Sequence, residues 1–216
     1  MDSFTNRTEA GALLAEEFGK HAGRFSSPLV LGLPRGGVPV AAAVARALDA
    51  ELDILTVRKV GVPGQPELAM GALASGDIRV RNERVIRGLG VSEDSFNRVA
   101  RNELEELQRR ETRFRGERPR PSMRDRTVIL VDDGVATGST MRAAIQAVRQ
   151  QDPREVIVAV PVAAPDSLEL LRDEADDVIC LMAPAGFAGV GQWYRDFAQT
   201  ADEEVQSLLA EAWGEC

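Results

Sequence analysis

The sequence is poor in the residues on which several common classes of protein site depend. Its 216 residues include one histidine, His21, and two cysteines, Cys180 and Cys216. The cysteines form neither a disulfide framework nor a zinc-ligand spacing, and one histidine argues against the common histidine-dependent triads. There is no apolar run of about 18 residues, and the first residues lack a basic-then-apolar signal pattern. We therefore expect a cytoplasmic protein with no membrane partner.

Positive charge is scarce as well. The formal net charge is −8, which disfavours a nucleic-acid partner because phosphate polymers require excess positive charge. Of the 26 basic residues, 24 are arginine, and the two lysines are Lys20 and Lys59. Genome composition can explain a preference for arginine. Lys59, alone in the middle of such a chain, is nevertheless a candidate for chemistry.

Apolar runs alternate with helical patterns along the chain. After the run at 127–131, Met141, Ala144, Ile145 and Val148 recur at the spacing of a helix that packs on a sheet. Short buried strands are predicted at 28–33, 52–57, 127–131, 155–160 and 177–181. Strands that alternate with helices predict an α/β fold with a parallel sheet and right-handed crossovers. The length fits one domain.

Two segments are additional to a minimal α/β repeat. Residues 91–126 contain ten arginines and eight acidic residues, with apolar residues about a turn apart and Ser92 as a plausible N-cap. This pattern predicts an amphipathic helix that covers a sheet edge, in preference to an RNA-binding arm. Residues 183–199 are rich in glycine and aromatic residues, and Thr200 and Glu203 then have capping-box spacing for a final helix.

Residues 128–140 have the pattern of a phosphate-binding loop. A buried strand ends in Asp132 and Asp133, and a stretch of glycine and hydroxyl residues leads directly into a helix. Backbone N–H groups and the positive end of a helix favour a bound anion, and carboxylates can accept hydrogen bonds from sugar hydroxyls. The loop is neither a Walker loop nor a dinucleotide fingerprint. It predicts a sugar phosphate as ligand, the alternative being an acidic strand end followed by a helix cap.

This segment resembles the phosphoribosyl-pyrophosphate motif of type I phosphoribosyltransferases, in which apolar residues, two acids and a short spacer precede Thr-Gly-x-Thr. Residues 33–37, 57–61 with 66–68, and 190–197 are similar to a little-characterised bacterial branch of that family. The resemblance implies a mainly parallel sheet flanked by helices, with a small C-terminal hood and a charged helical insertion. The single domain, 1–216, would comprise a core of about 28–182, the insertion at about 91–126, and the hood with its helix at about 183–213.

The resemblance also implies roles for individual residues. Asp132 and Asp133 would contact the ribose hydroxyls and, indirectly, a magnesium ion, while Arg35 and Lys59 would be catalytic residues acting on the departing pyrophosphate. A cis peptide is implied near Arg35–Gly36. The pyrophosphate loop would comprise Pro34, Arg35, Gly36 and Gly37. The 5′-phosphate loop would comprise Val135, Ala136, Thr137, Gly138, Ser139 and Thr140. For the acceptor, the candidates are Phe187, Trp193 and Tyr194, which either stack on a base or pack a small core.

The implied activity is transfer of 5-phosphoribosyl from phosphoribosyl pyrophosphate to a nitrogenous, nucleobase-like acceptor, with Mg²⁺ and release of pyrophosphate. The partners would be these small molecules and, as an assembly, a homodimer. Ala136 stands where enzymes for 6-oxopurines usually carry Asp, which disfavours hypoxanthine and guanine. The alternative is a non-catalytic protein that senses phosphoribosyl pyrophosphate or a nucleotide. Arg35 and Lys59 favour the enzyme, since a sensor need not keep them. A diphosphokinase ranks last, because no ATP-binding segment is recognisable.

Overall fold

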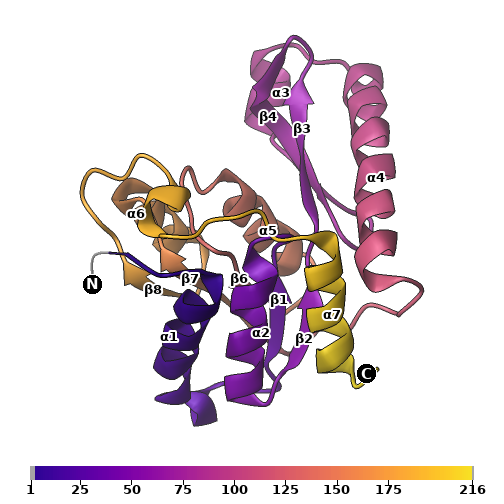
Figure 1. Ribbon diagram of the computed structural model, residues 1–216. Helices are drawn as coiled ribbons and strands as arrows, with labels where there is room; N and C mark the ends of the chain where they lie inside the picture. The colour runs from indigo at the N-terminus through magenta and orange to yellow at the C-terminus, as the bar shows by residue number, and fades with distance from the viewer. Residues whose placement is uncertain (1–2, 216) are drawn as a thin grey trace.

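The computed structural model describes residues 3–215 and contains two β-sheets (Figure 1). Five parallel strands form the larger sheet: β1 (Leu29–Gly32), β2 (Glu51–Ile54), β6 (Thr127–Val131), β7 (Glu155–Val162) and β8 (Asp177–Met182). Their spatial order is β2-β1-β6-β7-β8. Three antiparallel strands form the smaller sheet in chain order: β3 (Val57–Val62), β4 (Gln65–Ala74) and β5 (Ile78–Arg81).

Helices cover both faces of the parallel sheet, which confirms the predicted α/β fold (Figure 1). On one face lie α1 (Arg7–Gly19), α2 (Gly37–Leu48) and α7 (Asp202–Trp213), and on the other α5 (Ser139–Arg149) and α6 (Pro165–Glu174). Successive residues of a strand point to opposite faces. Accordingly, Val128 and Leu130 of β6 join the core under α5, and Ile129 and Val131 join the core under α2.

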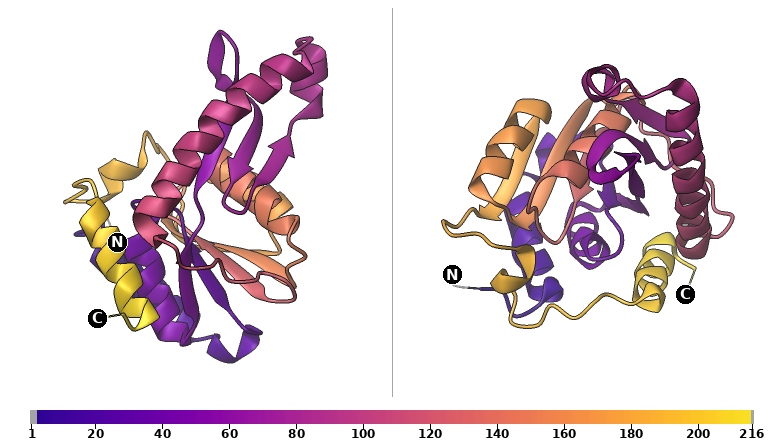
Figure 2. Two further views of the ribbon diagram at one scale, coloured as in Figure 1. Left: turned by 90° about the vertical axis from the view of Figure 1, so that its right-hand side faces the viewer. Right: turned by 90° about the horizontal axis from the view of Figure 1, so that it is seen from above.

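The antiparallel sheet, with α3 (Glu83–Gly88) and α4 (Glu93–Arg115), forms an arm that projects from the parallel sheet (Figure 2). The arm has its own core, in which Phe96 and Leu107 of α4 pack against Met70 and Leu73 of β4. At the other end of α4, Phe114 joins the core of α2 and α7. The helix therefore connects the arm to the parallel sheet.

Two expectations from the sequence need correction. The strand expected at 52–57 is two strands, β2 and β3. β3 and β4 form a hairpin, and Pro63 and Gly64 form its two-residue turn. Gly64 has a φ of +81°, a value that glycine adopts without a steric penalty. At the final helix, Ala201 is the N-cap and no side chain caps it. Thr200, the predicted cap, is buried and lies one residue before the N-cap.

A buried ion-pair network fastens the end of α4 to β2. Arg115, which is 8% exposed, donates to the Asp53 carboxylate, which is 2% exposed. Arg115 Nη2 also donates to the Ile54 carbonyl at 3.3 Å, and Arg120 donates twice to Glu111, at 2.6 and 2.7 Å. Burial raises the pKa of Asp53, and the charge of Arg115 opposes that rise. The position of α4 beside the parallel sheet therefore depends on Arg115.

Replacing Arg115 with Ala should destabilise the fold strongly, because Asp53 would remain buried without its cation. We expect the free energy of unfolding in urea to fall by about 3–5 kcal/mol. Arg46→Ala is the matched control, since its exposed pair with Glu211 should contribute at most about 1 kcal/mol. Equal, small losses for the two variants would contradict this role of the buried pair.

Candidate functional site

The loops after β1 and β6 meet at the carboxyl edge of the parallel sheet. These strands are neighbours in the sheet, and the helices that follow them, α2 and α5, lie on opposite faces. In open α/β sheets, ligands usually bind at the point where helices after neighbouring strands lie on opposite faces of the sheet. The two loops predicted to bind pyrophosphate and ribose phosphate therefore lie side by side.

Two glycines allow these loops to approach closely. A Cβ atom on Gly37 would lie 2.6 Å from the Val131 carbonyl oxygen, and one on Gly36 would lie 2.0 Å from Asp133 Oδ2. A side chain at position 37 would collide with backbone, and one at position 36 would displace the Asp133 carboxylate. The backbone also turns sharply here, with the cis peptide bond between Pro34 and Arg35, one residue earlier than expected.

Asp132 and Asp133 lie directly opposite these glycines. Asp132 Oδ1 accepts a hydrogen bond from the Asp133 amide at 2.9 Å, and Asp133 Oδ2 accepts one from Arg7 Nε at 2.7 Å. Burial raises the pKa of both carboxyl groups. The neighbouring charge of Asp133 raises the pKa of Asp132 further, whereas Arg7 opposes the rise at Asp133.

The predicted 5′-phosphate loop leads into α5. Gly138, with a φ of +73°, is the N-cap, so the first amides of α5 point away from the helix body with no intrahelical acceptor. Thr137, Ser139 and Thr140 are arranged around this end, with Ser139 and Thr140 exposed. Val135 differs from them: its side chain is buried and its amide donates to the Val162 carbonyl at 2.9 Å, which anchors the loop.

Ala136 is exposed, and its carbonyl accepts a hydrogen bond from Ser167 Oγ at 2.6 Å. This contact fixes the loop to the start of α6. The small Ala136 side chain leaves the position without a titratable group.

Arg35 lies at a cavity of about 260 Å³ between the pyrophosphate loop and α4. Its guanidinium is 3.3 Å from Asp202 at the start of α7, and the Arg35 side chain is 32% exposed. Leu33, Pro34 and Thr140 also line the cavity, so it borders both predicted phosphate loops.

Lys59 lies elsewhere. It is exposed on β3 and lines a second cavity of about 170 Å³ together with Ser139 and Arg142 of α5. The structure therefore brings Lys59 to the 5′-phosphate loop and does not bring it into the cavity of Arg35.

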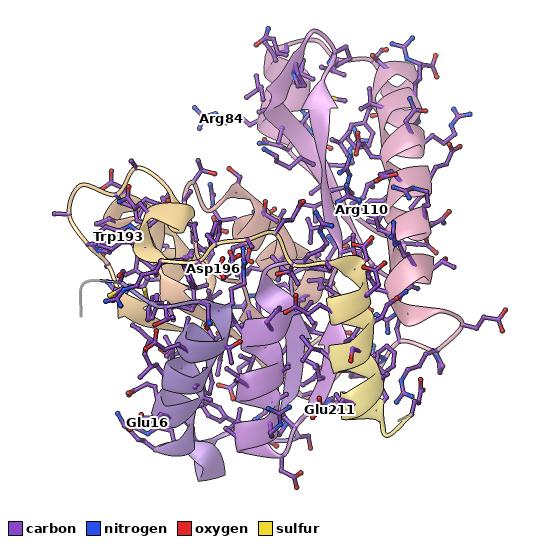
Figure 3. The ribbon with its side chains drawn as sticks, in the orientation of Figure 1. Glu16, Arg84, Arg110, Trp193, Asp196 and Glu211 are labelled. Carbon is purple, nitrogen blue, oxygen red and sulfur yellow. The ribbon has the colours of Figure 1, made fainter. Side chains whose placement is uncertain are left out.

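The hood loop, residues 183–199, contacts the loop that carries Asp132 and Asp133. Trp193 and Asp196 mark the course of the hood loop in Figure 3. Tyr194 is 6% exposed, contacts the ring of Phe4 and donates its hydroxyl to the Asp133 carbonyl at 2.6 Å. Its ring thus packs a small core, one of the two roles that the sequence left open. The rings of Phe187 and Trp193 are half-buried and stacked, with centroids 6.5 Å apart.

Sequence reasoning missed Arg7, which links three segments. Besides Asp133, it donates to the Ala198 carbonyl at 2.6 Å and lies 4.0 Å from the centre of the Phe197 ring. Arg7 is the first residue of α1, where the helix dipole disfavours a cation. That unfavourable position was the available signal that Arg7 has a partner elsewhere.

Within residues 3–215, no helix is both long and apolar enough to cross a membrane. At the β1–β6 edge, segments from both ends of the chain meet, since α1 and the hood loop both contact Asp133.

Comparison with known proteins identifies related chains. The sequence is 46% identical over 212 residues to a Mycobacterium tuberculosis H37Rv protein named "putative phosphoribosyl transferase". That match covers 98% of this chain but 47% of the relative, so the chain spans about half the length of the curated relative. A crystal structure of the protein TT1426 from Thermus thermophilus superimposes with a TM-score of 0.87 at 46% identity, covering 97% of this chain and 98% of that one.

The model of the phosphoribosyl transferase domain matches residues 5–192. This range includes both phosphate loops, the arm and the first part of the hood loop. The chain belongs to the phosphoribosyl transferase domain family.

Proposed function

We propose that the protein transfers 5-phosphoribosyl from phosphoribosyl pyrophosphate to a nitrogenous, nucleobase-like acceptor and releases pyrophosphate. One observation carries the proposal: the carboxylate pair Asp132–Asp133 lies between the Gly36–Gly37 turn and a loop of exposed hydroxyls that leads into the start of α5. A ligand with ribose hydroxyls between two phosphate groups matches this order of donors and acceptors.

The reaction that we propose is a displacement at C1 of the ribose. The bond from C1 to the pyrophosphate oxygen breaks, its electron pair leaves with the pyrophosphate, and a ring nitrogen of the acceptor forms the new bond. Asp132 and Asp133 would hold the ribose hydroxyls, and residues 137–140 would hold the 5′-phosphate. The protein would act mainly by positioning and by stabilising charge.

The carboxylate pair fits a magnesium ion that arrives with the donor. Among the described residues, no three His, Cys, Asp or Glu side chains gather into a metal site, and Mg²⁺ on a phosphate substrate commonly uses only one or two protein carboxylates. Bound Mg²⁺ would neutralise charge on the pyrophosphate. Asp132 and Asp133 would be its protein contacts, through water.

The two basic residues would have separate roles. Arg35, at the 260 Å³ cavity, would donate to the pyrophosphate. Lys59, beside Ser139, would contribute positive charge near the 5′-phosphate. The acceptor would be read by the Phe187–Trp193 pair, and the absence of a carboxylate at Ala136 disfavours 6-oxopurines.

The test of the proposal is pyrophosphate release from phosphoribosyl pyrophosphate and Mg²⁺, with a panel of nitrogenous bases as acceptors. We expect at least one base to give stoichiometric pyrophosphate and the matching nucleotide. Binding of the donor without turnover across the panel would instead support the sensor, and no binding of the donor would contradict both functions.

A second prediction concerns ribose recognition. Changing Asp132→Asn together with Asp133→Asn should weaken binding of ribose 5-phosphate by at least about 10- to 100-fold, because losing even one hydrogen bond to a charged group costs about 1.5–3 kcal/mol. Isothermal titration calorimetry measures this. Asp173→Asn, on the exposed surface of α6, is the control. Unchanged affinity in the double variant would mean that the carboxylates do not contact the ribose.

The electrostatics of Asp132 predict a gain in stability without ligand. The pKa of Asp132 in the folded protein lies above its unfolded value of about 3.9. The folded protein therefore binds this proton more tightly than the unfolded chain does, and stability is lost as the pH rises from the unfolded pKa through the folded pKa. Asp132→Asn removes the cost of burying the charged carboxylate, and the Asn side chain can still accept a hydrogen bond from the Asp133 amide.

We expect the variant to melt above the wild type at pH 8, by about 2–4 °C for each kcal/mol gained at this chain length. The difference should shrink as the pH is lowered towards about 4, the unfolded pKa. Differential scanning calorimetry with Asp173→Asn as control checks this, and an equal or lower melting temperature at pH 8 would be contrary to a desolvated Asp132.

A further inference from the structure

The cavity beside Arg35 has a second basic wall. Three arginines of α4, Arg109, Arg110 and Arg113, line it together with Arg35. We call these three the arginine wall. Figure 3 shows Arg110 on the side of α4 that faces β3. The cavity is therefore formed jointly by the pyrophosphate loop and by the charged helical insertion.

Helix geometry gathers these arginines on one face. With Glu106 they stand at i, i+3, i+4 and i+7, which places them on one stripe of the helix surface. The apolar residues of α4 that pack in the arm and parallel-sheet cores, among them Leu107 and Phe114, occupy other positions. The near-neutral charge of the whole segment conceals this local excess.

The cavity has more positive than negative charge. Arg109 and Arg110 both pair with Glu106, at 2.8 and 2.7 Å, and Arg113 and Arg35 both pair with Asp202, at 2.6 and 3.3 Å. Four guanidinium groups thus share two carboxylates, in a protein whose net charge is −8. Each guanidinium carries five N–H donors in a planar fork, so donors remain for a further anion.

Arg113 pairs with Asp202, which is 12% exposed and belongs to α7, so that pair joins two helices. The pairs of Arg109 and Arg110 with Glu106 contribute little to folding, because the two arginine side chains are 63% and 46% exposed. Glu106 lies on the same helix, so its pairs with Arg109 and Arg110 join no two elements. The four arginines converge on space beside a predicted phosphate loop, and guanidinium forks match phosphate oxygens well.

We infer that the arginine wall and Arg35 bind the pyrophosphate group from two sides, so that the helical insertion supplies part of the donor site. The inference rests on the proposed function. Arg35 would hold the group from the turn before Gly36, and α4 would hold it from across the cavity. Negative charge grows on the pyrophosphate as the bond to C1 breaks, and the wall would stabilise that charge.

The test is the affinity of the full chain for inorganic pyrophosphate, phosphoribosyl pyrophosphate and ribose 5-phosphate, by isothermal titration calorimetry. In Arg109→Ala with Arg110→Ala, the dissociation constants of the first two should rise by about 10- to 100-fold. That of ribose 5-phosphate, which lacks the pyrophosphate, should change by less than about threefold. The control is Arg98→Ala with Arg101→Ala, residues of α4 that do not line this cavity.

Glu106→Gln should change the pyrophosphate affinity in the opposite direction. Without the Glu106 carboxylate, Arg109 and Arg110 lose their ion-pair partner, so pyrophosphate should bind at least about threefold more tightly. A purely structural role for these arginines predicts no tightening. Circular dichroism and thermal melting of each variant check that the fold is intact.

The outcomes separate the two claims. Equal pyrophosphate affinity in the wild type and in the double alanine variant, or no pyrophosphate binding by the wild type, would overturn the arginine wall. Weaker pyrophosphate binding by the double alanine variant than by the wild type would support the arginine wall, even if the wild type did not bind phosphoribosyl pyrophosphate. Failure of the wild type to bind phosphoribosyl pyrophosphate would count against the proposed function alone.

Discussion

The close approach of two backbone turns determines the site. Gly36 and Gly37 lie so near Val131 and Asp133 that a single Cβ atom would collide with a carbonyl or a carboxylate oxygen. Because β1 and β6 are adjacent, a ligand at one turn is necessarily within reach of the other. The carboxylates, the 5′-phosphate amides and Arg35 can serve one ligand because the two turns touch.

The remaining parts of the chain hold these turns in place or extend them. Arg7 and Tyr194 both bind Asp133, one at its carboxylate and one at its carbonyl, so the N-terminal helix and the hood loop fix the proposed ribose-binding residue from two sides. On the opposite side, α4 is held at the sheet edge by Arg115 and Asp53. That anchor is what brings the arginines of α4 towards the pyrophosphate turn, so a structural ion pair supports the candidate site at a distance.

The part of the fold that follows local rules could be predicted from the sequence. The strand, carboxylate pair and helix start over 128–140 are contiguous, and Ser92 caps α4 as its position predicts. Features that depend on distant pairing could not be predicted. Arg7 meets a residue 126 positions away. The hairpin after Lys59, by contrast, is local, and its Pro63–Gly64 turn is a sequence signal that the strand expected at 52–57 overlooked. The net charge summed over residues 91–126 did not indicate the arginine wall, because the helix places three of the arginines of this segment on one face.

We propose that the two turns form one donor site, and a crystal structure of the full chain with phosphoribosyl pyrophosphate and Mg²⁺ would test this proposal. We expect the ribose hydroxyls within hydrogen-bonding distance of Asp132 and Asp133, the 5′-phosphate at residues 137–140, and the pyrophosphate at residues 34–37. A donor that contacts only one of the turns, or that binds away from the β1–β6 edge, would contradict it.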